Sequence, residues 1–179
     1  MSKSAYLLLS VLLGGLTACS TTPPVAVRTD YDHGTRFGGY HTYALDAGPT
    51  GLSPAGNAAL QESLRSNLAT RGFKEASAKT ADLYIISVVL TQEKLHTIPT
   101  GGTTYLPSRY GRYGGTWLIN TKVNEYTEGS LVIDFVDRKT HKLVFRGLGQ
   151  AAVGLKERNA AAIREAVSQI VAAYPAAGT

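Results

Sequence analysis

Histidine and aspartate residues gather in one short stretch of the chain. His33 follows Asp30 and Asp32 closely, and His41 stands on a predicted strand nearby. Such side chains can bind zinc or a similar ion, but a transition metal normally needs at least three converging protein ligands. Asp30 and Asp32 also suit a turn leading to Gly34, in which their carboxylates accept hydrogen bonds from main-chain N–H groups. We expect the turn and no metal, and the sequence implies no cofactor.

The sequence lacks the local patterns of nucleophilic and phosphate-binding enzymes. The Gly129-Ser130 pair stands in a predicted turn, not in a GxSxG nucleophile elbow. The glycines between positions 101 and 115 lack the spacing of a Walker or GxGxxG loop. Asp134 and Asp137 could in principle flank a glycosidic bond, but two-residue alternation places them on opposite faces of their strand. We therefore expect no catalytic residues.

One segment has the composition of a contact surface. Between Thr97 and Thr116 the chain combines tyrosine, arginine and five glycines. Aromatic rings stack on sugars or pack on proteins, and arginine pairs with carboxylate or phosphate. The bland alternative is a flexible surface loop without a ligand, because nothing in the composition specifies a target. The candidate contact residues are Tyr105, Arg109, Tyr110, Arg112, Tyr113 and Trp117.

The N-terminus has the layout of a secretory signal. Lys3 precedes an uncharged, leucine-rich stretch from Ala5 to Ala18, which is shorter than the about 20 residues needed to span a bilayer. The stretch ends in Leu16-Thr17-Ala18-Cys19, which resembles the lipobox of bacterial lipoproteins, where the cysteine is lipidated. Cys19 is the only cysteine in the chain, so no intramolecular disulfide can form, and lipidation accounts for the odd thiol.

These features predict a lipid-anchored precursor with three parts. Residues 1–18 form a cleaved lipoprotein signal peptide, 19–25 a lipidated tether with Pro23-Pro24, and 26–179 a single domain. By resemblance to lipoprotein sorting, Ser20 in place of an aspartate favours the outer membrane, with the domain facing the periplasm; display on the cell surface is the alternative. The chain has a formal net charge of +5 but contains no long run of basic residues. We therefore expect no nucleic-acid partner.

Periodicity predicts an α+β fold. Leu60, Leu64 and Leu68 recur at a spacing of four before Gly72, and a second helical face runs from Ala160 to Tyr174. We expect both helices to pack on one face of an antiparallel or mixed sheet, whose strand order the sequence leaves open. The predicted strands are Val25 to Tyr31, Tyr40 to Leu45, Asp82 to Leu90, Trp117 to Tyr126, Ser130 to Val136 and Lys142 to Leu148.

Two linked segments carry a family resemblance. The run from Tyr126 to Asp134, followed by the run from Asp137 to Gly147, resembles the core signature of the lipoprotein family known as domain of unknown function 4136. Segments 30–43 and 68–83 are similar to the family's opening and middle. The chain departs from the family at Leu45 and Phe145, where tryptophan is frequent, and in its long Gly/Tyr insertion. The resemblance implies a bacterial envelope lipoprotein and no accepted activity.

The sequence therefore predicts only a general class of function. We expect a membrane-anchored envelope lipoprotein that acts as a non-catalytic binding or structural module, with an envelope protein or glycan as the possible partner. The alternative is a periplasmic hydrolase of an envelope polymer, which would require an acid or base with a strongly perturbed pKa in a cleft.

Overall fold

The computed structural model describes residues 25–48, 50–90, 129–151 and 160–176. The predicted signal peptide, Cys19, the segment 97–116 and the predicted strand Trp117 to Tyr126 lie outside these ranges. Within them no helix combines the length and the apolar character needed to cross a membrane.

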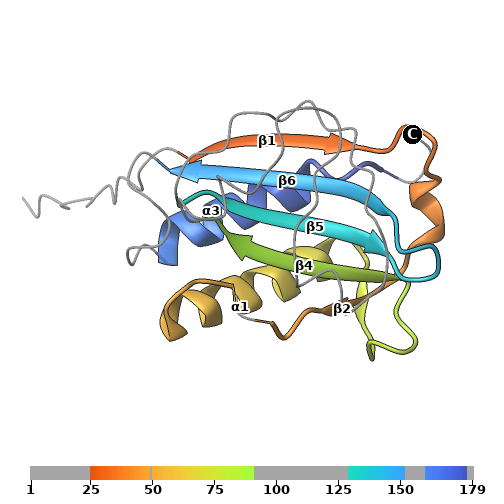
Figure 1. The fold of residues 1–179 in the computed structure, drawn as a ribbon, viewed down its shortest axis with the longest axis horizontal. Helices are drawn as coiled ribbons and strands as arrows, with labels where there is room; N and C mark the ends of the chain where they lie inside the picture. The colour runs from red at the N-terminus through yellow and green to blue at the C-terminus, as the bar shows by residue number, and fades with distance from the viewer. Residues whose placement is uncertain (1–24, 49, 91–128, 152–159, 177–179) are drawn as a thin grey trace, which may run out of the picture.

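The described residues form one mixed sheet with two α-helices behind it (Figure 1), which confirms the α+β prediction. The strand order is β1-β6-β5-β4-β2-β3. The pairs β1–β6, β6–β5 and β5–β4 are antiparallel, whereas β2 runs parallel to both β4 and β3. The elements are β1 (Val25–Tyr31), η1 (Phe37–Gly39), β2 (Thr42–Leu45), α1 (Pro54–Thr70), β3 (Lys74–Glu75), β4 (Leu83–Val89), β5 (Leu131–Asp137), β6 (Leu143–Ala151) and α3 (Ala160–Ala172).

Two short elements were not predicted. The 3-10 turn η1 buries Phe37, and β3 contributes only two residues at the edge beside β2. Neither element is long enough to show a hydrophobic period of 2 or 3.6 residues, so periodicity predicts neither of them. The predicted strands and helices that fall within the described ranges are all present.

Helix α1 ends at the predicted glycine, Gly72, and its start has a cap that was not predicted from the sequence. Ser53 caps the N-terminus, because its Oγ accepts a hydrogen bond from the Gly56 N–H at 3.2 Å, and Pro54 occupies the first turn. At the other end Gly72 adopts a φ of 84°, and the Phe73 N–H donates to the Leu68 carbonyl at 3.0 Å. This is a Schellman-type stop, which needs a residue that tolerates positive φ.

One apolar core lies between the sheet and the helices. From α1 it takes Leu60, Leu64 and Leu68, each at most 1% exposed. Tyr174, just beyond α3, packs edge-on against Phe37 and Phe73, with centroid distances of 5.2 and 5.5 Å. Its hydroxyl has no hydrogen-bond partner among the described residues, and burial raises the pKa of this phenol above its usual range.

Two glycines of β6 let α3 lie close to the sheet. A Cβ on Gly147 would collide with the Ile170 side chain of α3, and a Cβ on Gly149 would come within 2.8 Å of the Ala166 Cβ. Both glycines are buried on the helix-covered face of the strand. The missing side chains are therefore a packing requirement, and the helix occupies the space that they would fill.

Gly147→Ala should destabilise the domain, because the added methyl overpacks the contact with Ile170. We expect a loss of about 1–3 kcal/mol in the free energy of unfolding, measured by urea denaturation. Gly39→Ala is the matched control, since its new Cβ would meet no atom within 4 Å, and it should change stability by less than about 0.5 kcal/mol. Equal stability of the two variants would contradict this packing.

Candidate functional site

Strand register brings four chain segments to one end of the sheet. Val25 of β1 pairs with Ala151 of β6, and Leu131 of β5 pairs with Val89 of β4. Leu131 also pairs with Gly149, two residues before Ala151. These positions lie together at the left of Figure 1, and we call this edge the tether end, because the chain enters β1 there.

The two ends of segment 91–128 are joined at the tether end. The Gly129 N–H donates to the Leu90 carbonyl at 2.8 Å, and the Leu90 N–H donates to the Ser130 carbonyl at 2.9 Å. Gly129 has a φ of 81°, as expected of a glycine in a turn. The segment holding all six candidate contact residues therefore leaves the sheet and returns to it at one point, although those residues lie outside the described ranges.

The other face of the sheet, away from both helices, carries a buried ion pair. Arg146 donates from Nε to Asp134 Oδ1 and from Nη2 to Asp134 Oδ2, each at 2.6 Å. The side chains are 2% and 0% exposed. Val88, Leu90, Val132 and Leu148 form an apolar cluster on the same face. We call this side the second face.

A third charge lies in the same row across the strands. Asp30 of β1 pairs in register with Arg146, which in turn pairs with Asp134. Residues directly opposite each other in a sheet share a face, so the row reads acid, base, acid from β5 to β1. Asp30 is half-buried, and its Oδ1 accepts a hydrogen bond from the Tyr31 N–H at 2.9 Å.

The ion pair was missed from the sequence. Sequence spacing relates Asp134 only to Asp137 and gives no partner for Arg146. Regular pairing continued from Val136 and Leu143 would place residue 134 opposite residue 145, and the irregularity between Phe135 and Val136 shifts the partner of Asp134 to Arg146. Asp137 instead accepts a hydrogen bond from the Tyr40 hydroxyl at 2.7 Å, so the two aspartates act separately, as alternation predicted.

Two carboxylates with shifted pKa values are committed to the fold. Burial by itself raises the pKa of Asp82, but bonds from the His41 N–H, the Thr42 N–H and the Thr42 hydroxyl outweigh it and hold the pKa below its ordinary value. The pKa of Asp137 is lowered in the same way: burial raises it, but hydrogen bonds from the Lys139 and Thr140 N–H groups and from the Tyr40 hydroxyl outweigh burial. Both groups are ionised structural acceptors.

The predicted aspartate turn is confirmed for Asp32, whereas Asp30 lies in β1 and accepts its hydrogen bond from the Tyr31 N–H. Asp32 Oδ1 accepts from the Gly34 N–H at 2.9 Å, and its Oδ2 accepts from the Thr35 hydroxyl at 3.0 Å. Across the described ranges, no three histidine, cysteine, aspartate or glutamate residues are grouped as a metal ion would require.

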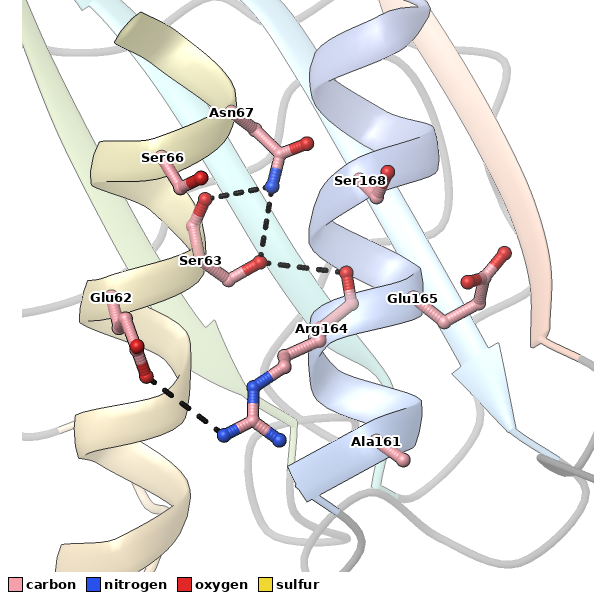
Figure 2. A pocket seen from close by; sticks show the side chains of 8 residues that line it. All are labelled: Glu62, Ser63, Ser66, Asn67, Ala161, Arg164, Glu165 and Ser168. Atoms are coloured by element: carbon pink, nitrogen blue, oxygen red, sulfur yellow. Dashed lines mark hydrogen bonds and ion pairs between the residues drawn. The ribbon is translucent and has the colours of Figure 1, made fainter. Parts of the chain in front are cut away.

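A shallow polar groove of about 440 Å³ runs between α1 and α3 (Figure 2). Ser63 crosses it, donating from Oγ to the Arg164 carbonyl at 3.5 Å, while Asn67 donates to the Ser63 carbonyl at 2.8 Å. The Ser63 hydroxyl proton is thus directed at the main chain. The groove follows the contact between the two helices. It is lined by Glu62, Ser63, Ser66, Asn67, Ala161, Arg164, Glu165 and Ser168.

Comparison with known proteins identifies the family. The model of the domain of unknown function DUF4136 matches residues 27–176, and the chain belongs to this family. No curated protein was found to match the chain.

Two solved structures share the fold. A DUF4136 family protein from Bacteroides thetaiotaomicron is 18% identical, with a TM-score of 0.61, covering 83% of this chain and 94% of its own. A PDZ domain protein from Parabacteroides distasonis is 16% identical, with a TM-score of 0.52, covering 84% of this chain and 36% of its own. At these identities the likeness concerns the fold alone.

Breaking the buried ion pair should be costly. Asp134→Asn removes the carboxylate charge that accepts two hydrogen bonds from Arg146 in a buried site, and we expect a loss of about 3–5 kcal/mol in unfolding free energy. The double change Asp134→Leu with Arg146→Met removes both charges and should cost less than the single change. Denaturant unfolding of both variants provides the comparison.

The exposed pair Arg65–Glu75 is the matched control. Its Nε–Oε2 distance is 2.8 Å, but the side chains are 49% and 43% exposed. Glu75→Gln should therefore cost no more than about 1 kcal/mol. If Asp134→Asn costs as little as Glu75→Gln, the second face is not a low-dielectric environment.

Proposed function

We propose that this protein is a lipid-anchored envelope lipoprotein that acts by binding a partner close to the membrane, without catalysis. The observation that carries the proposal is the tether end: the chain enters the domain there, and the segment rich in tyrosine and arginine leaves and returns there. Anchor and candidate contact surface are thereby joined to the same edge of the sheet.

The length of the tether supports a location near the membrane. Strand β1 begins at Val25, the sixth residue after Cys19. An extended chain spans at most about 3.6 Å per residue, so lipid on Cys19 holds the start of β1 within roughly 20 Å of the bilayer surface. Several acyl chains on one residue provide a lasting anchor, whereas a single chain binds only reversibly. With Ser20 after the cysteine, the proposed membrane is the outer one, with the domain in the periplasm.

The composition of segment 97–116 supports binding. Tyrosine and tryptophan offer large rigid contact areas at low entropic cost, and arginine adds charged, bidentate hydrogen bonding. An envelope protein or a glycan suits such a surface. Among the described aspartates, Asp82 and Asp137 accept structural hydrogen bonds and Asp134 pairs with Arg146, which favours binding over hydrolysis at these three positions.

Replacement of Cys19 tests the anchor. In Gram-negative cells fed labelled palmitate, the full chain should acquire label and sediment with membranes, whereas Cys19→Ala should lose the label. Ser20→Ala changes the adjacent residue without removing the thiol and should keep it. Label on Cys19→Ala, or none on the unaltered chain, contradicts lipidation at this residue.

Removal of the candidate contact residues tests binding. We expect deletion of Tyr105 to Tyr113 to reduce cross-linked envelope partner at least tenfold, measured by affinity capture and mass spectrometry after in-cell cross-linking. Lys79→Ala is the control, because Lys79 is exposed in the turn before β4, at the opposite end of the sheet. Retained capture after the deletion, with unchanged thermal unfolding, contradicts binding through this segment.

A further inference from the structure

Strand β1 is an edge strand among the strands that the structure describes. It pairs with β6 on one side, and no described strand pairs with the other. Just after β1, the Asp32 N–H donates to the carbonyl of Val144 in β6 at 3.0 Å, which fixes the alternation. Even-numbered residues of β1 therefore direct their main-chain groups toward β6, and Val25, Val27, Thr29 and Tyr31 direct theirs outward.

This edge carries two opposite charges on one face. Arg28 and Asp30 are two residues apart in β1, so both side chains belong to the second face. Arg28 is exposed and Asp30 is half-buried. The charged row Asp134, Arg146, Asp30 thus reaches the edge of the sheet with a negative group, and a positive group stands beside it along the strand.

We propose that a second copy of this chain adds to the sheet by antiparallel pairing of β1 with β1, centred on Thr29. In this register Arg28 of each copy lies opposite Asp30 of the other. The outward main-chain groups of Thr29 face each other, and those of Val27 face Tyr31 of the second copy. The Arg28–Asp30 positions are then non-hydrogen-bonded pairs, in which side chains approach most closely.

Charge selects this register over its neighbours. Centring on Arg28 would place Arg28 opposite itself. Centring on Asp30 would place Asp30 opposite itself, although Arg28 would then face Asp32, and centring on Tyr31 would place Asp30 opposite Asp32. Centring on Val27 would pair Arg28 with Ala26. Only the Thr29 register pairs opposite charges at both positions, and it continues the alternating row of the second face into the second copy.

Asp30 has a different role in each state. In the single chain its Oδ1 accepts a hydrogen bond from the Tyr31 N–H, which is one of the outward main-chain groups of the edge. This bond occupies a donor that another strand could otherwise use. In the dimer that N–H donates to Val27 of the second copy, and the carboxylate pairs with Arg28. The two tethers leave from opposite ends of the paired strands, and each reaches roughly 20 Å, so both copies can be anchored on one membrane.

Charge exchange tests the register. For the purified full chain in mild detergent, sedimentation should show a dimer whose dissociation constant rises at least tenfold in Arg28→Asp, which sets aspartate against Asp30 twice. Adding Asp30→Arg to Arg28→Asp should restore the affinity to within threefold. A wild-type monomer, undiminished pairing of Arg28→Asp, or failure of the double change to recover overturns the proposal.

Disulfide cross-linking provides a second test of the register that leaves Arg28 and Asp30 unchanged. Asp30 also lies beside Arg146, so its replacement can disturb the fold. In a Cys19→Ser background, Thr29→Cys should yield a covalent dimer under mild oxidation, because Thr29 faces Thr29. Ala26→Cys, which faces Asp32 of the other copy, should not. Equal cross-linking of both cysteine variants, or none of Thr29→Cys, rules out this pairing.

Discussion

The register of the antiparallel strands β4, β5, β6 and β1 is the constraint on which the rest of the structure depends. A shift by one residue would move every side chain of a strand to the opposite face. Gly147 and Gly149 would then leave the helix-covered face, and Arg146 would be placed against Ile170 and α3. The same register sets Arg146 against Asp134, so a close helix contact on one face and a buried ion pair on the other specify a single alignment.

The ion pair is better understood as a device for specificity than as a source of stability. Desolvation of two charges offsets much of their attraction, so a buried pair adds little net stability even when its loss is costly. Misaligned strands would bury Arg146 without a carboxylate at 2.6 Å. The pair therefore disfavours wrong registers in a sheet whose central strands are otherwise almost uniformly apolar and offer little to distinguish one alignment from the next.

The individual helices, strands and turns could be predicted from the sequence more readily than the order and pairing of the strands. The leucine spacing and Gly72 mark α1, and the aspartate turn at Asp32 follows from local chemistry. Local signals carry no information on strand order, which explains why the parallel placement of β2 between β3 and β4 was not predicted. The Asp134–Arg146 pair depends on a cross-strand partner, and the role of Gly147 depends on a helix that begins more than ten residues later.

Under the proposed function, the fold would hold the lipid anchor and the candidate contact surface at the same edge of the sheet. The strand ends at Val25, Val89, Leu131 and Ala151 converge, so a lipid on Cys19 and the segment 91–128 would be joined to the same edge of a rigid sheet. A binding protein built in this way needs no catalytic centre, only a scaffold that holds a contact segment at a fixed distance from its anchor. Membership of DUF4136 is compatible with this role and does not specify a partner.

Site-specific photo-cross-linking in living cells tests the central claim most directly. A photoreactive amino acid replaces Tyr110 in one strain and Lys79 in another, and the products are identified by mass spectrometry. The account predicts that position 110 cross-links to a defined envelope protein or glycan and that position 79, at the opposite end of the sheet, does not. Equal cross-linking from both positions, or none from position 110, would contradict it.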